Sequence, residues 1–233
     1  MDSGLLKNVN MFSELSDDEL KKIYSLSSLK TFGKGEMIFF DTEPYSGFYI
    51  VLEGCVKIFK ILKDGREHIL HFVYPFNTFA EVPLFEQYDK VIKDEFTYPA
   101  NSMSIERNTR LILIRPAVFY SLLDKNKSMS FKIISGLAKK LRHLNKHIEN
   151  LSADIPKRLA CYLLELKTME NGKFKDGTVE LPISKHDLAA YLGTIDETLS
   201  RTLKKLQDRE IIEVKGKIIF IKNLPALKKI STE

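Results

Sequence analysis

Three polar side chains in the C-terminal part of the chain have the types and spacing needed to recognise DNA bases. Glu197, Ser200 and Arg201 are three and four residues apart, so a helix would place them on one face. Arginine suits the O6 and N7 atoms of guanine, and a carboxylate suits the amino group of cytosine. We predict that this face enters the major groove of double-stranded DNA, with Thr194 and Lys185 as further contacts.

The surrounding sequence predicts the two helices that would position these side chains. Ser184 is suited to cap a first helix, and Asp187 three residues later completes a capping box. Gly193 then ends that helix, because glycine adopts a left-handed conformation without strain. In the second helix, the residues expected on one buried face are Ile195, Leu199, Leu203 and Leu206. The alternative is a helical hairpin in a small bundle, with its polar face in solvent.

The segments on either side extend this pattern to a winged helix-turn-helix over residues 153–233. Residues 211–221 read as two short strands, with Lys215, Gly216 and Lys217 as the turn of a β-hairpin. Upstream, Pro156 fits the first turn of another helix, whose apolar residues would pack beneath the reading helices.

Composition places the chain among ordinary globular proteins. It has 233 residues, of which 44% are hydrophobic and 29% charged, enough for two domains with cores. No apolar run approaches the roughly 20 residues needed to cross a bilayer, and the first residues do not resemble a signal peptide. We therefore expect a cytoplasmic protein with no membrane contact. Because motifs typical of nucleophilic, metal or nucleotide chemistry are absent, we do not expect an enzyme.

The number of cysteines and the distribution of charge narrow the class of protein further. Cys55 and Cys161 are too few for a disulfide framework or a four-thiolate cluster within one chain, so an iron–sulfur cluster is not expected. Each is interpreted as a small buried hydrophobic residue. Residues 117–152 carry seven Lys or Arg against two Asp or Glu, and residues 153–233 carry 15 against 12. A basic excess in the second half is consistent with binding to phosphates.

A heptad pattern over residues 131–151 predicts a dimerisation helix, assigned to residues 117–152. Its apolar positions, spaced alternately by three and four, are Ile134, Leu137, Leu141, Leu144, Ile148 and Leu151. A strict two-per-heptad pattern favours burial against an equal helix, so we expect a parallel homodimer. The alternative is a helix packed on its own domain.

Residues 1–116 are predicted to form a leading helix over 12–29 followed by a β-roll. Short apolar runs alternate with turns at 37–40, 47–52, 56–61, 68–73, 102–105 and 111–114. Asp64 and Gly65 form a strong hairpin signal between two of these runs. The predicted fold class is thus α+β: a jelly roll like that of cyclic-nucleotide-binding domains, a long helix and a winged helix-turn-helix.

The order of these elements, together with Gly35-Glu-Met-Ile, the segments 49–58 and 64–67, and Glu197-Thr-Leu-Ser-Arg201, resembles the CRP/FNR family of bacterial transcription regulators. The resemblance covers residues 9–224. It implies an effector-gated regulator that binds DNA as a dimer and acts with RNA polymerase. The Glu-x-x-Ser-Arg pattern resembles the FNR and DNR branches and implies half-sites similar to TTGA.

The effector segment departs from the family's cyclic-AMP pattern, in which an arginine pairs with the cyclic phosphate. Pro99 is interpreted as occupying the arginine position, so cyclic AMP is not expected as effector. The motifs Phe-Ala-Glu and Tyr-Pro-Ala resemble DNR-like and HcpR-like regulators, which implies a response to nitric oxide through haem. The effector pocket is expected to contain Phe79, Glu81, Leu84, Phe85, Pro99, Asn101 and Ser102. Residues 87–96 make the intervening loop longer than the family norm.

A haem would need an axial ligand and an apolar cleft. His71, between Leu70 and Phe72, is the first candidate ligand. The apolar residues expected around a porphyrin are Phe72, Val73, Leu84, Phe85 and Phe131. They are equally consistent with a plain core. Two alternatives stay open: gating by another small ligand that is not a cyclic nucleotide, and a ligand-binding module that acts on a protein partner. The outward-facing Glu197 and Arg201 argue against the second.

Overall fold

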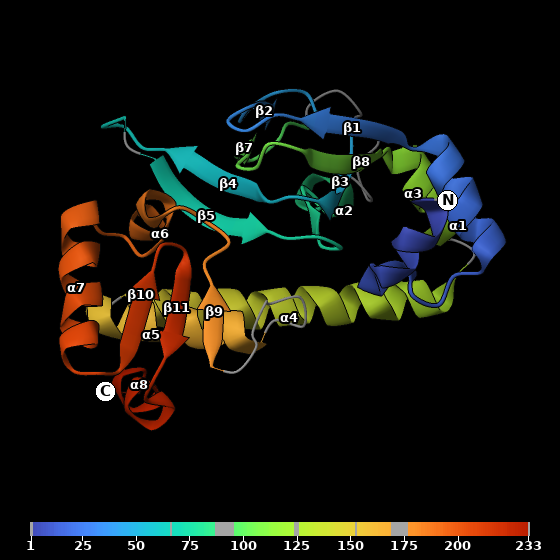
Figure 1. Cartoon of the computed structure of the whole chain (residues 1–233). Helices are drawn as coiled ribbons and strands as arrows, with labels where there is room; N and C mark the ends of the chain where they lie inside the picture. The colour runs from blue at the N-terminus through green and yellow to red at the C-terminus, as the bar shows by residue number, and fades with distance from the viewer. Residues whose placement is uncertain are drawn as a thin grey trace. The chain divides into compact units, whose positions relative to one another are not determined.

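A computed structural model describes residues 2–65, 67–86, 96–123, 126–151, 153–168 and 177–232. The chain divides into two compact units, residues 1–141 and 142–233, and each is described by itself (Figure 1). None of the helices in the described ranges is long and apolar enough to span a membrane.

The first unit combines a β-roll with helices at both ends of its sequence. Two short 3-10 helices, η1 (Asp2–Asn8) and η2 (Asn10–Phe12), precede the α-helices α1 (Asp17–Leu26), α2 (Val82–Glu86), α3 (Pro116–Leu123) and α4 (Lys127–Leu151), the last of which continues into the second unit. The strands are β1 (Ser28–Phe32), β2 (Met37–Phe39), β3 (Phe48–Glu53), β4 (Val56–Ile61), β5 (Glu67–Val73), β6 (Thr78–Phe79), β7 (Asn101–Ser104) and β8 (Thr109–Ile114).

The strands form two antiparallel sheets, ordered β1-β8-β3-β6 and β2-β7-β4-β5. Alternation along β3 explains how one sheet serves two cores: Tyr49 and Val51 face the roll interior, and Phe48 and Ile50 face the helices. The interior contains Phe32, Phe39, Tyr49, Val51, Val56, Ile58, Val73, Phe79, Tyr98, Ala100, Leu111 and Leu113. The predicted α+β fold with an N-terminal β-roll is confirmed.

The outer face of the first sheet is covered by helices. Phe12 of η2, Ile23 of α1, Phe119 of α3 and Met129 of α4 join this second core. Helix α1 begins at a complete capping box, in which the Ser16 hydroxyl accepts from the amide of residue 19 and the carboxylate there accepts from the backbone of residue 16. This cap starts the helix later than the predicted position 12.

Three local assignments differ from the sequence prediction. The predicted single helix over 117–152 is divided into α3 and α4, and the end of the predicted leading helix is the edge strand β1. The short strand β6 was not predicted. For the two strands, pairing with distant residues outweighs the local pattern: β1 pairs with β8, and β6 pairs with β3.

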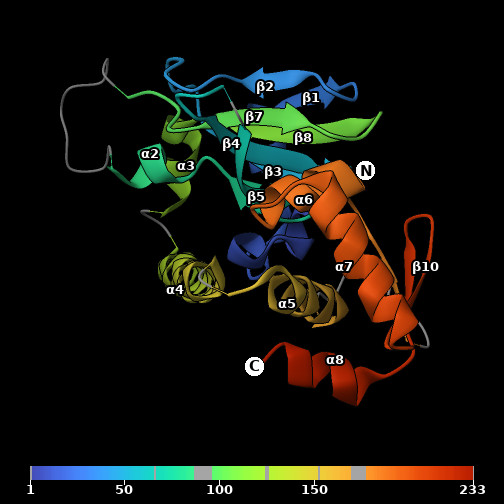
Figure 2. The same cartoon turned by 90° about the vertical axis from the view of Figure 1, so that its left-hand side faces the viewer.

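The second unit is a winged helix-turn-helix. It contains α5 (Ile155–Thr168), β9 (Thr178–Glu180), α6 (Lys185–Tyr191), α7 (Asp196–Asp208), β10 (Ile212–Lys215), β11 (Ile218–Ile221) and α8 (Leu224–Ile230). The wing is a three-stranded antiparallel sheet ordered β10-β11-β9. Helix α5 packs against both α7 and α8, and Figure 2 shows α6 and α7 joined by their short turn.

Candidate functional site

Of the five predicted DNA-reading residues, Glu197, Ser200 and Arg201 lie on the exposed side of α7, whereas Lys185 is the first residue of α6 and Thr194 precedes α7. The Arg201 guanidinium contacts the Glu197 carboxylate at 2.7 Å, and the two side chains are 67% and 70% exposed. Ser200 and Lys185 are also exposed, and Thr194 is half-buried before the start of α7. The pair holds a donor fork and an acceptor side by side at the helix surface, which is the chemistry needed to read base edges in a major groove.

The opposite side of α7 anchors the helix. Leu199, Leu203 and Leu206 are buried as predicted, and Thr202 joins them. The prediction for Ile195 was wrong, because its side chain is 63% exposed. Ile195 is the N-cap residue, with extended backbone angles of φ −105° and ψ 157°. It therefore precedes the helix and does not follow the helical spacing of the buried leucines.

The turn between the two helices has well-defined local chemistry. Ser184 caps α6 by accepting from the Asp187 amide at 3.0 Å, and its hydroxyl donates to the Asp187 carboxylate at 2.6 Å. Gly193 has φ +67°, a left-handed conformation that favours glycine. The amides of Gly193 and Thr194 donate to the carbonyls of Ala190 and Ala189, which is the Schellman pattern of helix termination.

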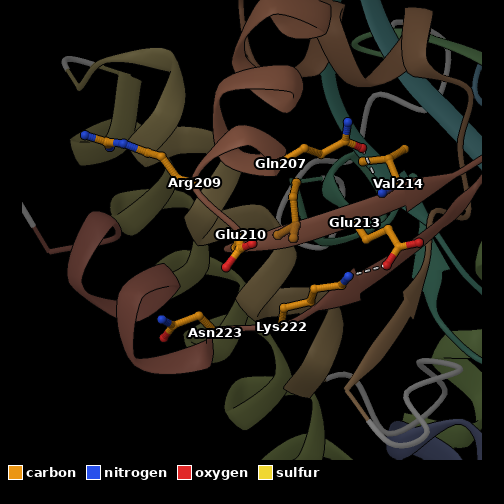
Figure 3. Close-up of a pocket in the computed structure, with 8 residues that line it drawn as sticks. Gln207, Arg209, Glu210, Glu213, Val214, Lys222 and Asn223 are labelled. Atoms are coloured by element: carbon orange, nitrogen blue, oxygen red, sulfur yellow. Dashed lines mark hydrogen bonds and ion pairs between the residues drawn. The ribbon is translucent and has the colours of Figure 1, made fainter.

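The wing is tied to the end of the reading helix by a polar network that lines a shallow pocket (Figure 3). The Val214 amide donates to Gln207 Oε1 at 2.9 Å. Glu213 contacts Lys222 at 2.6 Å and Lys215 at 2.9 Å. Hydrogen bonds first from Lys222 and then from Lys215 lower the pKa of Glu213 to about 2. These groups partner one another, so we interpret the pocket as a brace for the wing.

The residues expected to line an effector pocket lie on different sides of the first sheet. Phe79 and Ser102 belong to the roll interior, since Ser102 pairs in register with Ile58, whereas Leu84 and Phe85 pack with the helices. Asn101 is buried and accepts from the Asp41 amide. The Ser102 hydroxyl is fully buried and has no hydrogen-bond partner.

The prediction for Pro99 needs correction, because this residue is exposed and does not face the interior. Tyr98 is the side chain of the Tyr-Pro-Ala motif that enters the roll. Its ring stacks on Phe39 with centroids 3.8 Å apart and an interplanar angle of 8°. Its hydroxyl donates to the Gly47 carbonyl at 3.0 Å. This motif therefore directs an uncharged ring, and not a cation, into the roll interior.

Glu81 is buried and is paired with a lysine from α4. Lys140 Nζ donates to the Glu81 carboxylate at 2.6 Å and to the Thr78 carbonyl at 3.2 Å. The Thr78 hydroxyl also donates to Glu81. Nearby, the Tyr45 hydroxyl donates to the Ala80 carbonyl, and burial raises the pKa of Tyr45, so this donor stays protonated. Sequence reasoning missed Lys140, since no local pattern connects α4 with the segment before α2.

We expect Lys140→Met to lower the free energy of unfolding by about 1 to 3 kcal/mol, because the buried Glu81 carboxylate loses its cation while Thr78 remains. Adding Glu81→Gln should restore part of this loss. Denaturant unfolding of the two single variants and the double variant measures the coupling. Lys139→Met, at an exposed neighbouring lysine, is the control. Purely additive effects in the cycle would contradict a direct interaction.

The described residues do not assemble the haem site predicted from the sequence. His71, the candidate ligand, is exposed on β5. Val73 lies in the roll interior, Leu84 and Phe85 lie in the helix-side core, and Phe131 of α4 is 73% exposed. A porphyrin needs one apolar cleft with a ligand directed into it, and these residues do not share one. Within the described ranges, no cluster of three or more His, Cys, Asp or Glu is placed to hold a metal ion.

Helix α4 exposes the apolar positions of the predicted dimer seam. In the single chain Ile134 is 60% exposed, Leu137 41%, Leu141 61% and Leu144 45%. The side chains of Ile148 and Leu151 lie outside the described residues, although the helix backbone continues through them. Exposed apolar residues repeating along one stripe of a helix are typical of a surface that another helix covers.

These features define a class of protein. The chain combines a winged helix-turn-helix, which carries an exposed Glu–Arg pair, with a β-roll and a long helix whose apolar stripe is exposed. This combination is that of a DNA-binding regulator with a sensor-type domain. Residues 157–230 match the Crp-like helix-turn-helix domain, and residues 29–126 match the cyclic nucleotide-binding domain. The chain belongs to the CRP/FNR family of transcription regulators.

Similar proteins agree with this assignment. The chain is 28% identical over 216 residues to the probable transcriptional regulator flp of Lacticaseibacillus casei, with 92% of each chain covered. It is 26% identical over 195 residues to the CRP-like cAMP-activated global transcriptional regulator of Mycobacterium tuberculosis, with 82% of each covered. Among solved structures, FixK2 from Bradyrhizobium japonicum superposes with a TM-score of 0.72 at 25% identity, covering 88% of this chain and 96% of that chain.

Proposed function

We propose that this regulator binds DNA as a parallel homodimer and reads palindromes of TTGA-like half-sites. The observation that carries the proposal is the Glu197–Arg201 pair on the exposed side of α7, with Ser200 beside it. The exposed seam of α4 supports the dimer, because two copies presenting the same stripe bury it without other partners. As a transcription regulator it would act in the cytoplasm together with RNA polymerase.

A direct test compares a duplex carrying two TTGA-like half-sites with a random duplex of equal length, at fixed salt. A two-fold dimer presents its reading helices about one helical turn apart, so we expect tight binding at that half-site spacing. Fluorescence anisotropy should show specific binding at least about 1,000-fold tighter than binding to random DNA. Insertion of five base pairs between the half-sites places them on opposite faces of the duplex and should abolish this preference. Equal affinity for all three duplexes would refute the proposal.

We further propose that the first unit responds to a small ligand other than cyclic AMP. Several relatives are described as activated by cyclic AMP, but here the Tyr-Pro-Ala motif directs the uncharged Tyr98 ring into the roll, and Lys140 already pairs with Glu81. The resemblance to regulators of nitrosative stress rests on two short motifs, and the candidate haem ligand His71 is exposed on β5. Adding cyclic AMP to the anisotropy experiment should leave the affinity unchanged, and protein purified with haem supplied should show no Soret absorption band.

A further inference from the structure

Arg158, in the first turn of α5, connects two segments that flank the reading helices. Its Nε donates to the Ala153 carbonyl at 2.8 Å, and its Nη1 donates to the Leu192 carbonyl at 2.8 Å. Ala153 lies between the end of α4 and the start of α5, and Leu192 is the C-cap residue of α6. The half-buried side chain of Arg158 therefore connects the segment that follows α4 to the turn between α6 and α7.

The Leu192 carbonyl needs a partner from outside its own helix. At the end of α6, the Schellman hydrogen bonds satisfy the carbonyls of Ala189 and Ala190, but neither of these bonds is donated to the carbonyl of the cap residue Leu192. A guanidinium is suited to this position, because its planar fork directs separate N–H groups to separate acceptors. A lysine side chain has a single nitrogen, so it cannot donate to the Ala153 and Leu192 carbonyls in the two directions that the guanidinium provides.

Gly193 lies directly beside this contact. A Cβ at Gly193 would lie 3.1 Å from Arg158 Nη1, which is tighter than nine in ten real Cβ contacts, so the guanidinium would have to shift. Its φ of +67° is a second requirement for glycine at the same position. The reading helix α7 begins at Asp196, three residues beyond Gly193, so the geometry of this turn sets the direction of α7.

We propose that Arg158 is a positioning residue for DNA reading, which holds the turn before α7 in register with the segment that leaves α4. This inference rests on the proposed function. It assigns no DNA contact to Arg158; the residue acts through the backbone of the turn. Its loss should therefore lower discrimination between DNA sequences and leave the general attraction to phosphates intact.

The test is Arg158→Lys in the full chain, which keeps the charge and removes the fork. We expect about a tenfold loss of affinity for the palindrome, as hydrogen bonds to charged groups typically contribute. Affinity for random DNA and the salt dependence should not change, because the number of cations is the same. Arg209→Lys, at an exposed arginine of the same unit, is the matched control and should behave as wild type. Unchanged palindrome affinity, or an equal loss on both duplexes, would overturn the proposal.

Hydrogen exchange separates positioning from general stabilisation. In Arg158→Lys the amides of Gly193 and Thr194 should exchange faster, while those in the buried part of α5 keep wild-type rates. Uniform acceleration across 153–232, or failure of the variant to fold, would show that Arg158 only supports the domain and would overturn the proposal. If wild-type protein itself does not distinguish the palindrome from random DNA, the proposed function fails, whereas the exchange result still reports on Arg158.

Discussion

Replacing Leu141 and Leu144 together with lysine is expected to convert the proposed dimer to a monomer and to abolish specific DNA binding. These side chains are 61% and 45% exposed in the single chain, and each leucine buried against a partner contributes about 1.5 to 3 kcal/mol. The double variant loses this contribution in both copies. It also places four ammonium groups in a seam that cannot solvate them. Sedimentation equilibrium gives the mass, and anisotropy on the palindrome gives the affinity.

The control for this prediction is Ser135→Lys, which adds a positive charge to α4 at an exposed position next to the stripe but not within it. It should stay dimeric and bind as wild type. A double variant that remains dimeric would show that α4 does not carry the interface. A monomer that retains full affinity for the palindrome would show that two reading helices are not required.

Arg201→Ala is expected to reduce affinity for the palindrome by about 1 to 3 kcal/mol, which is roughly five- to 150-fold. The structure adds a reason for the specificity of this effect: Glu197, at 2.7 Å, restrains the guanidinium before DNA is bound. The loss should be confined to duplexes that keep the guanine of the half-site, so replacing that base should no longer matter to the variant. Mobility shifts on a set of single-base variants of the half-site measure this.

Lys205→Ala provides the comparison, since Lys205 is exposed in the last turn of the same helix. Removal of a cation there should weaken all duplexes alike or none of them. If Arg201→Ala also weakens every sequence equally, Arg201 contacts phosphate and another residue reads the guanine.

Much of the fold was predictable because it depends on neighbours in the sequence. The cap at Ser184 and the left-handed Gly193 involve residues within three or four positions, and each lies where the local pattern indicated. The strand β4 was predicted at its observed bounds, since the Asp64–Gly65 turn marks where the hairpin reverses. The heptad stripe was also readable, because helical periodicity alone decides which residues share a face.

Tertiary structure decided the questions that depend on which residue faces which neighbour. Whether Tyr98 or Pro99 enters the roll is set by how the chain joins β7, and a shift of one residue reverses the two faces of a strand. Ile195 is exposed because α7 begins one residue after it. The contacts of Lys140 with Glu81 and of Arg158 with Leu192 join residues 59 and 34 positions apart. No periodic pattern encodes such pairs, because the folded backbone alone brings a long charged side chain within hydrogen-bonding distance of an acceptor that is distant in the sequence.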